Sequence, residues 1–255
     1  MSWNKSLLIQ KLEEIKNRGW IPSGRSRSNV GSVGNTLEDL LGIRENNLPL
    51  ANAGIWELKA QRRDTQSLTT LFHCEPRPGK VVPKILLPKY GWPHKSIPGE
   101  KSFRVTMSGD RYTDRGFRII VNWNDRRVYV DFNAQYVSRD HKSWLKEVKR
   151  KTGLGQINPQ PYWEFDTLER KARQKLHNMV YVIADSRRNR QEEFYYGEAW
   201  FLEEFRFEKF LRAIEDGIVL IDFDARTHHN HGTKFRVREA RETWTAFYDK
   251  VTRVM

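Results

Sequence analysis

The segment Ile55-Trp56-Glu57-Leu58-Lys59 places a carboxylate and an ammonium group two positions apart. The two-residue period of a β-strand puts Ile55, Glu57 and Lys59 on one face. Trp56 and Leu58 then face the other way, into a core. Such a pair suits metal-assisted hydrolysis of a phosphodiester, because the Glu57 carboxylate and the Leu58 carbonyl are oxygen ligands of the kind that Mg²⁺ prefers. Lys59 can act on the attacking water and offset phosphate charge. On most strands, however, the same pattern is only an ion pair on a solvated face.

A nuclease centre of this kind usually needs a second carboxylate a few residues upstream of the strand. In the preceding segment NNLPLANAG, Asn52 occupies the appropriate place, and an amide is a neutral and much poorer ligand for Mg²⁺ than a carboxylate. Glu38 is a candidate outer ligand or water-positioning group on a short predicted helix, NTLEDLLGI. It also suits a capping box with Asn35, and Gly42 is expected to end this helix. Both roles of Glu38 stay open.

A second group with chemical potential lies in the C-terminal part of the chain and consists of His228, His229, His231 and Arg236. A metal site is one interpretation, but the carboxylate or Cys spacing of a standard zinc site is missing. A solvated loop is another. The third is base readout, since Arg and His can both donate to guanine O6 and N7. Asp222 and Asp224, on the strand just before, can accept from cytosine N4, although aspartates at strand ends are often only turn formers.

The charge balance favours nucleic acid as the partner. The chain has 45 Lys and Arg against 32 Asp and Glu, which gives a formal net charge of +13. Such an excess is typical of proteins that neutralise phosphates, and no polybasic tail or lipidation motif favours a membrane instead. No apolar run approaches the roughly 20 residues that span a bilayer. The charged N-terminal segment does not resemble a signal peptide. Cys74 is the single cysteine, so we expect no internal disulfide and a cytoplasmic location.

The hydrophobic pattern predicts a mixed α/β fold with a central sheet. Helices are expected over residues 6–16, 35–42, 166–175 and 206–216, near the centre of 138–160, and from about residue 239. Strands are expected over residues 54–61, 103–107, 116–123, 126–132, 179–185 and 218–225. Asp166 and Glu169 suit a second capping box. The Pro- and Gly-rich residues 76–100 are expected to form an extended surface loop. His73 and Cys74 are expected to pack in a core or to support a neighbouring functional group rather than to act in catalysis.

The chain resembles the MvaI/BcnI-type restriction endonucleases, which are related in fold to the mismatch-repair nicking endonuclease. The resemblance rests on an ordered series of segments: VGNTLEDLLGI, NNLPLANAGIWELKAQR, SLTTLFHCEPRP, KYGW, YWEFDTLERKARQKLHNMVYV and HHNHGTKFRV. It implies a nuclease core of the PD-(D/E)xK type, with a mixed central sheet flanked by helices. It also implies one endonuclease domain over residues 1–255, with a catalytic lobe over about 1–185, a DNA-recognition lobe over about 186–255 and a DNA-binding cleft.

The resemblance further implies a monomer that cuts double-stranded DNA at a short, often G·C-rich site with Mg²⁺, and a DNA methyltransferase encoded nearby. Glu57 and Lys59 match the family's catalytic residues, and Asn52 stands where the family has a metal-binding Asp. His229, His231 and Arg236 match its base-reading His-x-His and Arg. The basic loop and turn residues are interpreted as phosphate contacts, with solvated surface charge as the alternative for each: Arg25, Arg27, Arg187, Arg188 and Arg190.

Asn52 leaves the activity of this chain open. One explanation is deliberate inactivation of a type II restriction endonuclease, in which case the chain binds its site but cuts poorly. Two alternatives remain from the sequence: a naturally non-catalytic, sequence-specific DNA-binding module, and a nicking or repair endonuclease of the same fold.

Overall fold

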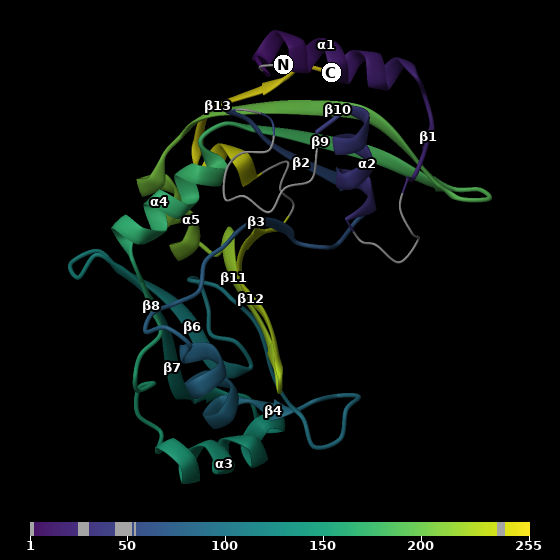
Figure 1. Cartoon of the computed structure of the whole chain (residues 1–255). Coiled ribbons are helices and arrows are strands. Elements are labelled where there is room, and N and C mark those ends of the chain that lie inside the picture. Colours follow the sequence, from purple (N-terminus) through teal and green to yellow (C-terminus); the bar gives the residue numbers. More distant parts are fainter. Residues whose placement is uncertain (1–2, 25–30, 44–52, 54, 239–242) are drawn as a thin grey trace. The chain divides into compact units, whose positions relative to one another are not determined.

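The computed structural model describes residues 3–24, 31–43, 53, 55–238 and 243–255, and it is mixed α/β with three sheets (Figure 1). The chain forms two compact units. Unit 1 comprises Met1–Ser67, Ala172–Arg206 and Phe247–Met255, and unit 2 comprises Leu68–Lys171 and Phe207–Ala246. Both units are therefore discontinuous in sequence, unlike the division near residue 185 that the sequence suggested. In the described part of the chain, no helix combines the length and apolar character needed to cross a membrane.

Unit 1 is built on a five-stranded sheet in the order β1-β10-β9-β2, with β13 also paired to β10. Its elements are α1 (Lys5–Asn17), β1 (Ile21–Pro22), α2 (Ser32–Leu40), β2 (Glu57–Arg62), β9 (Met179–Arg188), β10 (Glu192–Phe205) and β13 (Tyr248–Arg253). The last turn of α4 (Phe165–Leu176) also belongs to this unit. β2 and β9 run parallel, whereas β10 is antiparallel to β1, β9 and β13. The division expected at residue 185 falls within the β9–β10 pairing.

The core of unit 1 follows from the expected apolar faces. Leu8, Leu12 and Ile15 on α1 are buried, and the Asn4 side chain caps this helix by accepting from the Leu7 N–H at 2.9 Å. Trp56 and Leu58 join the same cluster from the segment of β2, as the strand pattern predicts. Burial of this apolar surface is the main force that fixes β2 in the sheet.

Unit 2 contains two sheets, one of five strands in the order β3-β12-β11-β5-β4 and one of three in the order β6-β7-β8. The strands of the larger sheet are β3 (Thr69–His73), β4 (Trp92–Pro93), β5 (Lys101–Met107), β11 (Val219–Arg226) and β12 (His229–Val237). The smaller sheet has β6 (Arg115–Asn122), β7 (Arg127–Val137) and β8 (Tyr162–Glu164). The helical elements are a π-helical segment (Val82–Tyr90), α3 (Lys142–Thr152), α5 (Phe207–Glu215) and short 3₁₀ turns at Arg139–His141 and Trp244–Ala246.

Aromatic side chains dominate the core of unit 2. Phe103 of β5 contacts Phe223 of β11 edge to face, with ring centroids 5.7 Å apart, and Phe235 of β12 stacks on Phe72 of β3 at 4.8 Å. The Trp163 indole N–H donates to the Cys74 carbonyl at 2.9 Å, so its one polar group is satisfied in the core. These contacts lie on one side of the larger sheet, which leaves its other side for polar residues.

Several local predictions are wrong, each for a physical reason. Residues 76–100 contain the π-helical segment, because Val82, Leu86 and Tyr90 are buried; Pro88, inside it, lacks the N–H that a regular α-helix would need there. Helix α2 begins at Ser32, so Asn35 and Glu38 lie inside it and form no capping box. Gly42, with φ of +66°, follows its end as expected.

The structure also differs from expectation at the second predicted capping box. Helix α4 begins at Phe165, so Asp166 lies in its first turn, where its side chain accepts from Arg126 at 2.9 Å. Residues 239–242, where the last helix was expected to begin, lie outside the described residues; Thr243 is helical, and after it the chain forms a 3₁₀ turn at Trp244–Ala246 and strand β13. That strand is stabilised by pairing with β10, a contact that no local pattern encodes.

Candidate functional site

Glu57 is the centre of a charged group in unit 1. Its carboxylate is 4% exposed, and each of its oxygens contacts an ammonium group. Lys59 Nζ lies 3.0 Å from Oε1, and Lys175 Nζ lies 3.2 Å from Oε2. The predicted placement of Glu57 and Lys59 on one face of β2 agrees with this contact. We call the three residues the Glu57 triad.

Strand pairing explains why Lys175 reaches this carboxylate. Glu57 is the first residue of β2 and is in register with Met179, the first residue of the parallel strand β9. The Glu57 N–H donates to the Asn178 carbonyl at 2.9 Å. Only two residues separate Met179 from the end of α4, so the last turn of that helix lies beside the start of β2.

Tyr248, the first residue of β13, holds the end of this helix. Its hydroxyl donates to the Leu176 carbonyl at 2.8 Å, which satisfies one of the carbonyl groups that a helix leaves unpaired at its C-terminus. Burial raises the pKa of Tyr248 well above its usual value, and the negative charge of Glu57 adds to the shift. The phenol therefore stays neutral and remains a hydrogen-bond donor near the Glu57 triad.

The other residues predicted for the catalytic centre are placed only in part. Asn52 lies outside the described residues, so its position relative to Glu57 stays a prediction. Leu58 is buried in β2, and the role of its carbonyl as a metal ligand also stays a prediction. Glu38 is half-buried in α2, and its backbone carbonyl accepts from the Ile43 N–H at 2.9 Å near the end of that helix.

Of the three side chains of the triad, that of Glu57 is the one that can bind Mg²⁺. Glu57 supplies a hard carboxylate oxygen ligand of the kind that Mg²⁺ prefers. Among the described residues, no three His, Cys, Asp or Glu side chains come together as a metal site. A Mg²⁺ ion would thus be held by Glu57 together with groups beyond the side chains described, of which position 52 and the Leu58 carbonyl are the candidates.

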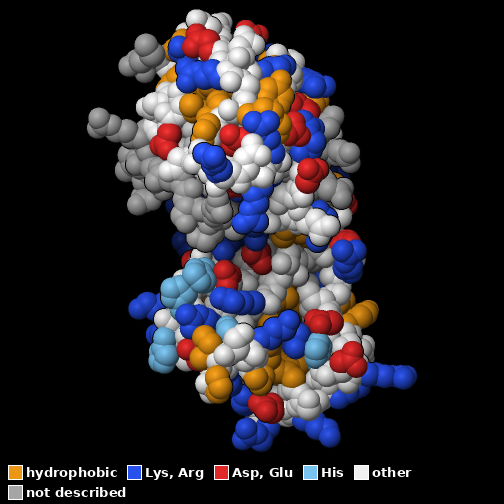
Figure 2. Space-filling model, turned by 90° about the vertical axis from the view of Figure 1, so that its right-hand side faces the viewer, with side chains coloured by type: hydrophobic (Ala, Val, Ile, Leu, Met, Phe, Trp, Pro, Cys, Tyr) orange, Lys and Arg blue, Asp and Glu red, His pale blue; other side chains and the backbone are white. Residues whose placement is uncertain are grey.

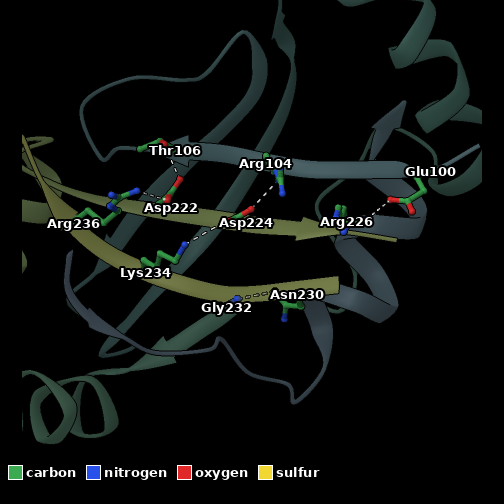
Figure 3. Close-up of polar contacts among 10 residues, drawn as sticks. All are labelled: Glu100, Arg104, Thr106, Asp222, Asp224, Arg226, Asn230, Gly232, Lys234 and Arg236. Atoms are coloured by element: carbon green, nitrogen blue, oxygen red, sulfur yellow. Dashed lines mark hydrogen bonds and ion pairs between the residues drawn. The ribbon is translucent and has the colours of Figure 1, made fainter. Parts of the chain in front are cut away.

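A second candidate region is the polar side of the larger sheet of unit 2. On β11, Ile221, Phe223 and Ala225 are buried, whereas the alternating Asp222, Asp224 and Arg226 are half-buried on the opposite side. Neighbouring strands add basic and hydroxyl groups to this side, and Figure 2 shows Lys, Arg, Asp, Glu and His side chains gathered on the surface of unit 2. The charged face is defined here as Arg104, Thr106, Asp222, Asp224, Lys234 and Arg236 (Figure 3).

Within the charged face, each aspartate contacts two neighbours. Asp222 accepts from Thr106 Oγ1 and from Arg236 Nη1, both at 2.9 Å. Asp224 contacts Arg104 Nε at 2.8 Å and Lys234 Nζ at 3.2 Å. Burial opposes ionisation of Asp224, but the hydrogen bond and charge of Lys234, with Arg104, lower its pKa on balance. Both aspartates thus lie where they orient basic side chains, in addition to any acceptor role toward DNA.

Arg236 is held more firmly than a free surface arginine. Its Nη2 donates to the Leu68 carbonyl at 2.6 Å, in addition to the Asp222 contact. Its Nε is buried and has no hydrogen-bond partner among the described residues. A guanidinium fixed by its neighbours loses little side-chain entropy when it meets a planar acceptor pair.

The histidines lie at the tip of the β11–β12 hairpin rather than in a long loop. His228 has a φ of +61° in the turn, and His229 begins β12. His229 and His231, two residues apart on this strand, are exposed and contact each other edge to face with ring centroids 4.1 Å apart. The His229 and His231 side chains thus lie on the same side of the strand. Their role in base readout stays a prediction.

The candidate phosphate contacts lie in two places. Arg187 and Arg188 end β9 and Arg190 follows in the turn to β10. Arg187 pairs with Glu193 at 2.6 Å and covers the Trp20 ring at 4.4 Å. Arg25 and Arg27 lie outside the described residues.

Some residues of these sites carry no recognisable sequence signal. Lys175 is one of many basic residues, and only the tertiary pairing of β2 with β9 brings it to Glu57. Arg104 and Lys234 likewise reach Asp224 through strand register, on β5 and β12. His73 is exposed beside Lys234 at the end of β3, so its predicted core position is wrong. Cys74 is buried as expected, and burial raises the pKa of its thiol to about 11.

Known proteins match this chain in sequence family and in fold. The profile of the MvaI/BcnI restriction endonuclease family matches residues 9–248. The fold is similar to a solved complex of restriction endonuclease MvaI with its cognate DNA substrate, with a TM-score of 0.80, 23% identity and 100% coverage of both chains. For MvaI in the absence of DNA, the TM-score is 0.56 and the identity 20%, again with 100% coverage of both chains. At these identities the likeness is one of fold. No curated protein sequence matches the chain.

Proposed function

The chain belongs to the MvaI/BcnI restriction endonuclease family, and we propose that it is a type II enzyme that hydrolyses duplex DNA at a short specific site with Mg²⁺. In this proposal unit 1 is the catalytic lobe and unit 2 the recognition lobe of a monomer. A DNA methyltransferase encoded nearby would protect the host's own sites.

The observation that carries the proposal is the Glu57 triad. A buried carboxylate with Lys59 at 3.0 Å, on a strand whose other side is anchored in the core, is the arrangement that metal-assisted phosphodiester hydrolysis needs. Glu57 would hold the Mg²⁺ with position 52 and the Leu58 carbonyl, and the ion would supply charge stabilisation and a more acidic water. Lys59 would orient that water and offset the charge of the scissile phosphate. Glu38 is a further candidate for positioning water.

Recognition is assigned to the charged face and the hairpin tip of unit 2. Arg236, fixed by Asp222 and the Leu68 carbonyl, would donate to guanine O6 and N7. His229 and His231 would donate to the same kind of acceptor. Asp222 and Asp224 would accept from cytosine N4, since a carboxylate oxygen can accept more than one hydrogen bond. Arg25, Arg27 and the arginines of the β9–β10 turn would bind phosphates.

Asn52 makes this chain a poor catalyst in the proposal. With Glu57 as the nearby carboxylate, a dication that dehydrates reluctantly is held too weakly to promote hydrolysis. A missing anionic ligand should remove several kcal/mol of transition-state stabilisation, and each loss of about 1.36 kcal/mol lowers the rate tenfold. DNA binding survives, because replacing a carboxylate by an amide removes repulsion against the scissile phosphate.

The test is to compare the chain with its Asn52→Asp variant on plasmid DNA in Mg²⁺, with Ca²⁺ as a control that supports binding without cleavage. Discrete fragments from the Asn52→Asp variant alone are the expected result. A variant that is inert with several metals, on DNA both bare and methylated, contradicts the nuclease proposal and leaves a DNA-binding module. Nicked circles without linear product indicate a nicking enzyme instead.

A further inference from the structure

We infer that Lys175 is a positioning residue of the catalytic centre, which occupies Oε2 of Glu57 until a divalent metal ion displaces it. The inference rests on the proposed function of the Glu57 triad and deepens it. Its starting point is geometric: both oxygens of one buried carboxylate already contact ammonium groups, at 3.0 and 3.2 Å.

The triad carries more positive charge than structural pairing requires. One ammonium group is enough to neutralise a buried carboxylate, yet Glu57 has two, and the Lys59 and Lys175 side chains are each only about one-quarter exposed. The three side chains taken together therefore carry a formal net charge of +1. The phosphate of the proposed substrate carries negative charge, so it would interact favourably with a second lysine at this place.

Lys175 and a metal ion compete for the same atom. A dication that binds Glu57 must take at least one of the two oxygens, and Lys59 is covalently fixed two residues away on the same strand. Lys175 comes from another element, the last turn of α4, so it can leave Oε2 without disturbing β2. Like charges at such distances repel strongly, so Lys175 weakens metal binding as long as no phosphate is present.

Tyr248 fixes the backbone of the helix end that carries Lys175. Its hydroxyl bond to the Leu176 carbonyl fixes the helix end next to Lys175 by a group that stays neutral. The lysine side chain can move while the backbone that carries it is held. Metal and DNA should therefore bind cooperatively: the phosphate accepts the displaced ammonium group, and the metal then meets less repulsion.

The experiment measures the binding of Mn²⁺ alone to the full chain in the Asn52→Asp background, by the electron paramagnetic resonance signal of free Mn²⁺. We expect Lys175→Met and Lys175→Gln to bind Mn²⁺ on the order of tenfold more tightly than their parent, since a competing charge is gone. Lys175→Arg keeps the charge and should bind like the parent. Lys16→Met, which removes one charge from α1, is the matched control and should also bind like the parent.

A second measurement separates positioning from a merely structural role. Adding a short duplex with a phosphorothioate backbone, which resists cleavage, should tighten Mn²⁺ binding to the parent much more than binding to Lys175→Met. Circular dichroism melting curves establish that each variant is folded, and Lys175→Gln, which retains a donor of similar length, serves if Lys175→Met is not.

The outcomes are distinguishable. Equal Mn²⁺ affinity of the parent and both neutral Lys175 variants overturns the inference, and so does the failure of the parent and every variant to bind Mn²⁺. Mn²⁺ binding that depends on Lys175, in an Asn52→Asp variant that cuts no DNA, leaves the role of Lys175 standing and removes the nuclease proposal. Cleavage by Asn52→Asp with Mn²⁺ affinity indifferent to Lys175 does the reverse.

Discussion

The Glu57 triad of unit 1 and the charged face of unit 2 use the same residue types in different proportions. In the triad, one almost fully buried carboxylate contacts two ammonium groups. On the charged face, Asp222 and Asp224 lie two positions apart on β11. Each contacts one side chain on β5 and one on β12, the two neighbouring strands. The first arrangement concentrates charge on one group, and the second distributes it over half-exposed pairs.

The two arrangements of charge suit different functions. A buried group with surplus charge is costly to maintain unless another charged species completes it, which suits a place where ions are exchanged during a reaction. Half-exposed pairs in a sheet contribute little to stability, but they fix the direction of donors and acceptors. Direction is what the reading of base edges requires. The following variants test whether the two regions divide chemistry and recognition in this way.

The largest effect is expected in the triad. Lys59→Ala in the Asn52→Asp background should lower the cleavage rate by roughly 10²–10⁴-fold, the range typical for loss of a group that assists proton transfer. Specific DNA binding should change little, because Lys59 acts on water and phosphate rather than on bases. Single-turnover cleavage and a gel-shift titration in Ca²⁺ measure the two quantities, with Lys16→Ala as the control. Turnover within a few-fold of the parent would exclude Lys59 from the chemistry.

A smaller effect is expected on the charged face. Arg236→Ala should weaken specific binding by about 1–3 kcal/mol and relax discrimination at one G·C pair. Arg188→Ala is the matched control: a phosphate contact should weaken all sequences alike and reduce the slope of log affinity against log salt by about 0.9. Binding to randomised duplexes at several salt concentrations distinguishes these patterns. Equal losses for specific and random DNA with Arg236→Ala would make it a backbone contact.

The same binding assay extends to the hairpin tip. His229→Ala and His231→Ala are expected to follow Arg236→Ala, since all three are assigned to base edges. A stoichiometric transition metal released from the purified protein by a chelator would instead favour the metal interpretation of these histidines.

The smallest effect concerns stability. The pKa of Asp224 is lowered in the folded state, so its ion pairs stabilise the fold above the unfolded value of about 3.9, and this contribution is lost as the pH falls through the folded value. Asp224→Asn should cost up to about 1 kcal/mol at pH 7, and this difference should shrink as the pH falls below about 4, toward the folded pKa. Urea unfolding at both pH values measures it. Asp166→Asn, at an exposed ion pair, is the control, and a pH-independent difference for Asp224→Asn would contradict the charge argument.

Local patterns predict much of this molecule. The period of Leu8, Leu12 and Ile15 places helix α1, and the two-residue alternation around Glu57 places its side chain beside Lys59. The triad and the charged face are complete only through strand register. Lys175 and Glu57 are 118 residues apart in the chain, and nothing in the segment around either residue specifies the other.

Where prediction failed, long-range packing had decided the local structure. The residues after 243 lack a strand pattern that stands out, yet pairing with β10 makes Tyr248–Arg253 a strand. Residues 76–100 have the Pro and Gly content of a loop, but buried Val82, Leu86 and Tyr90 draw them into a helical segment. The two-unit division also follows from topology, because strands from distant parts of the chain share each sheet.

The parallel pairing of β2 with β9 has a consequence for synthesis of the protein. During translation Glu57 and Lys59 emerge long before Lys175, and Tyr248, which holds the helix end beside them, comes later still. Contacts so distant along the chain form late in folding. A ribosome-bound or truncated chain that ends before β13 therefore lacks the Tyr248 contact that holds the helix end beside the Glu57 triad. In the proposed nuclease, the residues around Glu57 would thus reach their final places only when nearly the whole chain has been made.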